Sequence, residues 1–161
     1  LVERRGSRSR GPGRPEILYG LTGAADTLFP SQEGQLLQDL ASYLEHRGHG
    51  DLVRAFFDAQ VERRRVAVRG RLEGLQGEAR IEEVARVLTE EGFMAQVETD
   101  ADGRTVLRLC HCPLQNLVEV TRAPCRSEMR FVRELLGERP VRVSYIPSGD
   151  AACCYTLNGE D

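Results

Sequence analysis

The chain has 161 residues, of which 40% are hydrophobic and 29% are charged, a balance that allows one average domain or two small ones and argues against wholesale disorder. No apolar run approaches the roughly 18 residues that a membrane span requires, and no signal-peptide pattern opens the chain, so we expect a soluble cytoplasmic protein without a membrane partner. The net charge of −3 argues against generic polyanion binding.

Basic residues are concentrated in residues 1–15, where Glu3 is the single acidic residue. Residues 1–4 and 16–21 have the composition of strands, and the Gly, Ser and Pro residues between them disfavour regular structure. Two strands around an arginine-rich loop are typical of the wing of a winged helix-turn-helix, whose recognition helix would lie upstream of Leu1. Such a wing contacts DNA phosphates, and a disordered basic tail is the alternative. The candidate DNA-binding residues are Arg4, Arg5, Arg8, Arg10 and Arg14.

The next part of the chain predicts helices. Thr22 can cap a short helical turn through Leu28, which Pro30 ends. A helix then begins at Ser31 and stops at the glycines of residues 48–50. The apolar residues on one face of this helix are Leu36, Leu37, Leu40, Ala41 and Leu44.

A second, longer helix begins at Asp51, and its apolar residues recur at steps of four and three with an interruption at Arg64. This stripe consists of Val53, Phe57, Val61, Val68, Leu72 and Leu75. It predicts either a helix–helix seam between two copies of the chain or packing within one copy, and it does not choose between them. Glycines weaken the far end of the helix, so we place a boundary near Gly77.

The remaining residues predict an antiparallel sheet with helices on one side. The expected elements are a helix at 79–91, strands at 93–98 and 105–109, helices at 113–120 and 126–136, and strands at 141–146 and 151–157. Asp102 and Gly103 predict a tight hairpin turn, and Gly137 predicts the end of the last helix.

These elements predict an α+β protein of three parts. Residues 1–30 would form the wing and its exit, residues 31–77 a helical linker, and residues 78–161 a cysteine-bearing sensor domain. We expect the helical linker to hold two copies of the chain together as a homodimer.

All five cysteines lie in the last third of the chain, and an odd number without a secretory signal favours metal binding, redox sensing or burial over a disulfide framework. Cys110 and Cys112 follow a strand, and Cys125 begins a helix, whose dipole favours a thiolate. Cys153 and Cys154 lie in the last strand, whose alternation sends them to opposite faces. Soft thiolates at element ends suit an iron–sulphur cluster or zinc, although the spacing does not match a zinc ribbon. Buried, unreactive cysteines are the alternative.

Cys112, Cys125 and Cys153 follow one another at intervals of 13 and 28 residues. Further short motifs accompany them in a fixed order: residues 112–118 (Cys-Pro-Leu-Gln-Asn-Leu-Val), residues 135–137 (Leu-Leu-Gly), and, near the N-terminus, residues 1–3, 13–15, 19–22 and 28–30. Taken together, they resemble the SufR-type repressors over nearly the whole chain. Those proteins are winged-helix regulators that sense iron–sulphur clusters and control the genes for cluster assembly.

The resemblance implies a homodimeric transcriptional regulator that binds double-stranded DNA, with repression as the expected direction, and that carries a [4Fe–4S] or [2Fe–2S] cluster in its C-terminal domain. Cys112, Cys125 and Cys153 would be cluster ligands. The candidates for a fourth ligand are Cys110, His111, Cys154, a nearby carboxylate and a small exogenous thiol. Some family members have a further cysteine between the second and last ligands, whereas this chain has none in that interval, with Arg139 near its middle. Because related regulators lack the cluster, zinc, redox-active thiols and no cofactor at all are the alternatives.

We expect no enzymatic activity. His111 and Cys112 are adjacent, so their side chains point apart and do not form a nucleophile and its base. The glycines at residues 11–13 lie between two strands rather than between a strand and a helix, so they do not predict a phosphate-binding loop.

Overall fold

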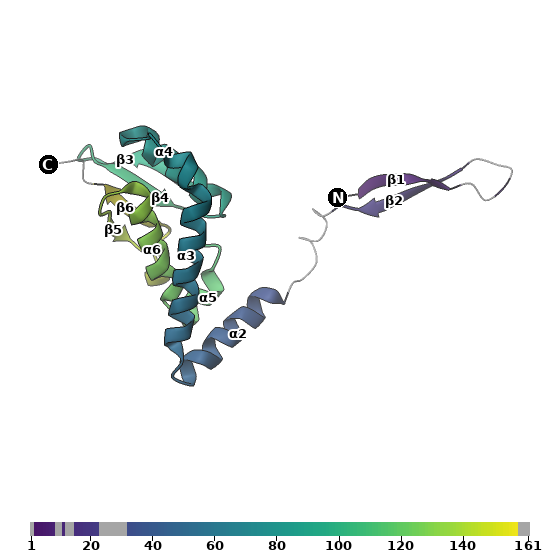
Figure 1. Ribbon diagram of the computed structural model, residues 1–161, viewed down its shortest axis with the longest axis horizontal. Coiled ribbons are helices and arrows are strands. Elements are labelled where there is room, and N and C mark those ends of the chain that lie inside the picture. The colour runs from purple at the N-terminus through teal and green to yellow at the C-terminus, as the bar shows by residue number, and fades with distance from the viewer. Residues whose placement is uncertain (1, 9–10, 12–14, 23–31, 158–161) are drawn as a thin grey trace. The chain divides into compact units, whose positions relative to one another are not determined.

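The computed structural model describes residues 2–8, 11, 15–22 and 32–157 (Figure 1). These described residues form five α-helices, one short 3₁₀ helix and two antiparallel sheets, so the predicted α+β class is confirmed. No helix in this part of the chain is long and apolar enough to cross a membrane. The helical turn predicted at residues 22–28 lies, apart from Thr22, outside the described residues.

The first of two compact units, Leu1–Gly34, contains a two-stranded antiparallel sheet. Strand β1 (Val2–Arg8) pairs with β2 (Glu16–Leu21), so the predicted hairpin is confirmed and its first strand is longer than predicted. The register shifts at Arg5, which is followed by Gly6 at φ +147°, and this extra residue makes a β-bulge. The identity of the hairpin as a wing stays a prediction.

The second unit, Gln35–Asp161, takes in residues 35–77 of the predicted helical linker as well as the predicted sensor domain. Its elements are α2 (Glu33–His46), α3 (Gly50–Leu72), α4 (Gly77–Glu90), β3 (Ala95–Thr99), β4 (Thr105–Leu109), α5 (Gln115–Val120), α6 (Ala123–Leu136), β5 (Val141–Ser144), the 3₁₀ helix η1 (Ile146–Ser148) and β6 (Cys153–Leu157). Strand β6 pairs with both β4 and β5, which gives the antiparallel order β3-β4-β6-β5. The predicted turn and helix end are present, with Gly103 at φ +78° and Gly137 at φ +79°.

One hydrophobic core joins α3, α4 and α6 to the sheet, and at its centre Leu88, Leu107 and Phe131 are completely buried. The apolar stripe of α3 contributes to this core and to a smaller one against α2, α5 and α6. Its buried members are Val53, Phe57, Val61 and Leu72. The stripe therefore packs within one copy of the chain, because α6 covers the face that a second copy would otherwise need.

Helix α2 has two apolar faces. Ala41 is buried and Leu44 is half-buried, and both belong to the smaller core. Leu36, Leu40 and Tyr43 recur at steps of four and three on another side of the helix, where their exposed fractions are 69%, 53% and 61%. The predicted single apolar face is therefore divided, since only the part that meets α3 and α5 is covered.

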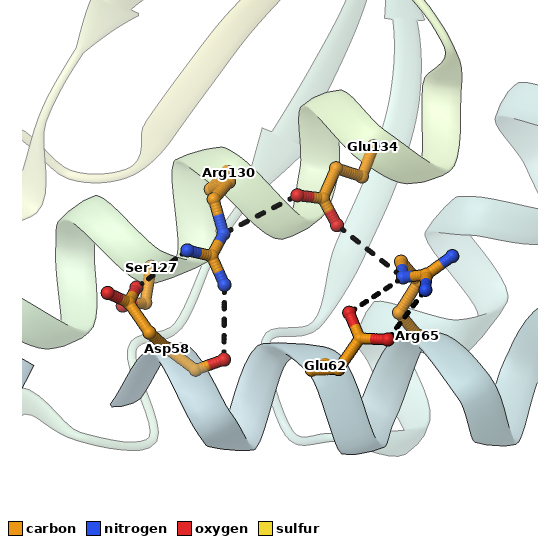
Figure 2. Close-up of polar contacts among 6 residues, drawn as sticks. All are labelled: Asp58, Glu62, Arg65, Ser127, Arg130 and Glu134. Carbon is orange, nitrogen blue, oxygen red and sulfur yellow. Dashed lines mark hydrogen bonds and ion pairs between the residues drawn. The ribbon is translucent and has the colours of Figure 1, made fainter. Parts of the chain in front are cut away.

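Polar side chains fasten α6 along α3 (Figure 2). Arg130 donates hydrogen bonds to the carboxylate of Asp58 at 2.9 Å and to its backbone carbonyl at 3.1 Å. Glu134 lies between Arg130 and Arg65, with nitrogen–oxygen distances of 3.4 and 3.9 Å. These contacts are exposed and individually weak, but they fix which turn of α6 lies beside which turn of α3.

Candidate functional site

Cys112, Cys125 and Cys153 line one pocket in the second unit. Cys112 lies between β4 and α5, Cys125 in the first turn of α6, and Cys153 at the start of β6. The pocket has a volume of about 40 Å³, and Phe93 and Leu109 form part of its apolar wall. Folding thus gathers thiols that are 13 and 28 residues apart in the sequence.

Sheet pairing explains why the thiols meet. Leu109, the last residue of β4, pairs with Cys153 on β6. The chain after β4 continues beside the residues that precede β3, where the His111 N–H donates to the Phe93 carbonyl at 3.1 Å. It then turns into α5, as the Cys112 carbonyl accepts a hydrogen bond of 3.2 Å from the Gln115 N–H. Cys112 is thereby held next to the start of β6.

Burial raises the pKa values of the Cys112 and Cys153 thiols, and the negative charge of Cys125 raises both further. The backbone N–H of Ile146, which lies 3.4 Å from the Cys153 sulphur, partly opposes the rise at Cys153. These thiols therefore resist ionisation in one another's presence. A bound cation would reverse that preference, because thiolates are the form that binds metals.

The other two cysteines lie outside the pocket. Cys154 pairs across the sheet with Arg108 of β4, and the Cys110 sulphur lies 3.6 Å from Oε1 of Gln96. The pKa of Arg108 is raised first by a hydrogen bond with Cys110 and also by the charge of Cys154. Strand alternation explains this arrangement, since it sends neighbouring side chains to opposite faces of the sheet. Three side chains were predicted from the sequence as candidates for a fourth ligand. Of these, His111 lines the pocket, whereas Cys110 and Cys154 do not.

Glu128 also lines the pocket, and the sequence did not single it out. It lies three residues after Cys125 on α6, so both project from the same side of the helix. The residue is 8% exposed, and burial raises the pKa of its carboxyl group to about 7 despite the attraction of Arg64. Arg64 donates a hydrogen bond of 3.1 Å to Oε2, while Oε1 has no hydrogen-bond partner among the described residues. The interruption of the α3 stripe at Arg64 was the one sequence signal for this buried pair.

Three arginines lie at or next to the thiol pocket. Burial raises the pKa of Tyr145 to about 12, and its interaction with the neighbouring Cys125 thiol adds to the rise. The guanidinium of Arg142 lies 3.9 Å from the centre of the Tyr145 ring. Arg122 and Arg126 join these side chains around a shallower adjoining pocket. Their charges would offset the negative charge of thiolates bound to a metal centre.

The potential ligand side chains of the pocket determine which kind of metal centre it could hold. No group of three or more His, Cys, Asp or Glu side chains within the described ranges is arranged to hold a single metal ion. The ligands of an iron–sulphur cluster are divided among two or four iron atoms, so the donor atoms need not all converge on one point. Soft thiols in an apolar pocket, with an unpaired buried carboxylate oxygen and arginines nearby, fit such a cluster.

The arginines of the hairpin form a separate candidate site in the first unit. Arg4, Arg5 and Arg8 are exposed on β1, and Arg5 forms an ion pair of 3.4 Å with Glu3. The other predicted members, Arg10 and Arg14, lie outside the described residues.

Comparison of the chain with protein-family models, with curated proteins and with solved structures gives no match. No relative therefore supplies a function. The thiol pocket and the basic hairpin are the features from which a function can be inferred.

Proposed function

We propose that this protein is a DNA-binding transcriptional regulator that senses an iron–sulphur cluster held by Cys112, Cys125 and Cys153. One observation carries the proposal: these three cysteines come from three separate elements and line one pocket. The resemblance had already singled them out from Cys110 and Cys154, which do not line the pocket. The resemblance to SufR-type repressors suggests that the regulated genes serve cluster assembly and that regulation is repression.

The pocket has the chemistry that a cluster requires. Thiolates are the usual ligands of iron–sulphur clusters, and apolar surroundings limit the access of water to them. Phe93, Leu109 and Tyr155 supply apolar surface at the pocket. Cluster binding would deprotonate the thiols and release protons, so occupancy would respond to iron, sulphide and oxidants.

DNA binding is assigned to the arginines of the hairpin. Arg4, Arg5 and Arg8 are exposed on β1, and exposed arginines supply phosphate contacts, which give salt-dependent affinity and little sequence preference. The proposal therefore assigns no base recognition to the hairpin.

A homodimer is supported by the uncovered face of α2. Leu36, Leu40 and Tyr43 on this helix are more than half exposed, and near the start of α3 the exposed fractions of Leu52 and Phe56 are 54% and 50%. Exposed apolar side chains grouped on one helix face, as on α2, favour association. We therefore assign the dimer contact to the exposed surface of the helical segment and not to the apolar stripe of α3, where the sequence had suggested it.

A physical route connects the pocket with this helical segment. Cys125 lies on α6, which is fastened to α3 through Asp58, Arg130 and Glu134 (Figure 2). Helix α3 is joined to α2 by the turn at Gly48. Regulation follows if the cluster binds more tightly to one arrangement of α6 on α3 than to another, because the helical segment then shifts with cluster occupancy.

Anaerobic reconstitution with iron and sulphide tests the proposal. The expected result is a brown protein with broad visible absorbance, with iron and acid-labile sulphide in equal amounts. Colourless protein with stoichiometric zinc would support a zinc regulator instead. Protein that binds neither metal, and in which oxidants change DNA binding through the thiols, would support a redox-thiol regulator.

A further inference from the structure

The pocket leaves one ligand position to be assigned. Both common cluster types take four protein ligands, and Cys112, Cys125 and Cys153 supply three. Any assignment of this position rests on the proposed function, since it concerns the fourth ligand of that cluster. Cys110 and Cys154 lie outside the pocket, which leaves His111 and Glu128 as side chains that line it and can ligate iron.

Glu128 has an unsatisfied oxygen atom in a buried place. The residue is 8% exposed, and Oε1 has no hydrogen-bond partner among the described residues. A buried polar atom without a partner costs free energy, so its persistence calls for an explanation such as a bound ion. His111, by contrast, is exposed, so its imidazole carries no such cost.

We propose that Oε1 of Glu128 is the fourth ligand of the cluster. Binding forms one oxygen–iron bond, the carboxyl group releases its proton to solvent, and no electron is transferred. Glu128 follows Cys125 by three residues on α6, so two ligands come from the same side of one helix. The donor set is then three thiolates and one carboxylate.

Arg64 is a positioning residue for this ligand. Its guanidinium donates a hydrogen bond of 3.1 Å to Oε2 and also binds Glu91, at the C-terminal end of α4. It lies 4.0 Å from the centre of the Phe131 ring, which further restricts it. With Oε2 held, Oε1 is the carboxylate oxygen left for iron, in the way that outer partners orient the ligands of other metal sites.

A carboxylate ligand gives the cluster a weak point. Carboxylate oxygen is a harder ligand than thiolate and suits iron within a sulphide cluster less well. The iron atom bound to Glu128 is therefore the one that dissociates first when iron is scarce or oxidants are present. That property makes occupancy responsive, whereas four thiolates would hold the cluster more firmly.

The test compares Glu128→Gln with Glu91→Gln in the anaerobically reconstituted chain. Both substitutions remove a carboxylate that binds Arg64, but Glu91 does not line the pocket. We expect Glu128→Gln to lose iron to a chelator about tenfold faster or more, with an altered electron paramagnetic resonance spectrum. Glu91→Gln should match the parent in both measurements. Equal effects of the two substitutions would overturn the proposal that Glu128 is a ligand. The faster iron loss would then come from the unpaired charge of Arg64.

Glu128→Cys provides a second variant that keeps a ligand at this position. A thiolate in place of the carboxylate should slow iron loss and lower the reduction potential, since non-thiolate ligands raise cluster potentials. Unchanged spectra and potentials in both Glu128 variants would overturn the proposal. So would a spectrum that changes with His111→Ala, or with the small thiol present during reconstitution, but not with residue 128. A parent protein that binds no cluster would instead contradict the proposed function, and the two failures are thereby separate.

Discussion

The Arg64 guanidinium on α3 donates a hydrogen bond of 3.1 Å to Oε2 of Glu128 on α6, and so joins the long helix to the thiol pocket. The carboxylate is buried, whereas the Arg64 side chain is 27% exposed. Removal of the arginine would leave a buried carboxylate without its charged partner. This pair accounts for a charged residue within an otherwise apolar stripe.

We expect Arg64→Met to lower the free energy of unfolding of the metal-free protein by about 3 kcal/mol, the cost of breaking a buried ion pair from one side. Urea denaturation measures this change in the free energy of unfolding. Arg65→Met, one residue along, removes an exposed ion pair with Glu62 and should change the unfolding free energy little. Equal losses in the two variants would show that the Arg64–Glu128 pair has no special importance.

Stability should also depend on pH through Glu128. Burial raises its pKa from an ordinary 4.5 to about 7, and the charge of Glu91 adds to the rise while Arg64 opposes it. The other titratable groups that interact with it are Cys112 and Tyr155. Because the folded protein binds this proton more tightly than the unfolded chain, the stabilisation is complete below pH 4.5 and is lost as the pH rises through about 7.

Glu128→Gln should remove that part of the pH dependence. The measurement is the urea midpoint of the metal-free protein at about pH 5 and about pH 8, compared between the parent and the variant. The parent should lose more stability than the variant between these two values. Parallel profiles would mean that Glu128 does not titrate in this range.

Cys153 and Cys154 are adjacent on β6, so their substitution provides a matched test of the cluster site. Cys153→Ser should abolish stable cluster binding, and the same holds for Cys112→Ser and Cys125→Ser, because each removes a thiolate at the pocket. Cys154→Ser should bind as much iron and sulphide as the parent, since Cys154 lies opposite Arg108, outside the pocket. Full iron content in any of the first three variants would refute the assignment of that ligand.

The basic hairpin should determine the salt dependence of DNA binding. We expect the joint replacement of Arg8, Arg10 and Arg14 by Gln to weaken binding to a duplex of random sequence. The slope of log affinity against log salt should become shallower by about 0.9 for each phosphate that the hairpin no longer neutralises. The control replaces three exposed arginines of the second unit, Arg63, Arg69 and Arg133, with the same change in net charge. An equal effect of both sets would mean that net charge alone explains the binding.

The exposed face of α2 predicts the oligomeric state. Replacement of Leu36, Leu40 and Tyr43 by Ser should convert a dimer into a monomer, as measured by light scattering after size-exclusion chromatography. Val141→Ser with Val143→Ser, at exposed apolar residues of β5, should leave the dimer unchanged. A parent protein that is monomeric at every tested concentration would contradict the homodimer.

Local sequence signals were sufficient for most of the elements. Gly103 and Gly137 occur at positive φ where the hairpin turn and the end of α6 were expected, since a left-handed backbone favours glycine whatever surrounds it. The long helix α3 and the two strands of the hairpin follow from periodicity and composition in the same way. Strand alternation also predicted that Cys153 and Cys154 point to opposite faces, because alternation depends only on the strand itself. The choice of Cys153 as the ligand came from the resemblance.

The tertiary structure decided which surfaces are covered and which distant residues meet. The stripe of α3 looked equally suited to a second copy and to its own chain, and packing by α6 covers it within one chain. Glu128 had no local signal as a pocket residue, since its burial depends on Arg64, which lies 64 residues earlier in the chain. By itself the sequence determined the helices, the strands and the spacing of three cysteines. Only packing decided that a buried carboxylate lies with those cysteines, because burial and ion pairing depend on contacts between elements that are far apart in the chain.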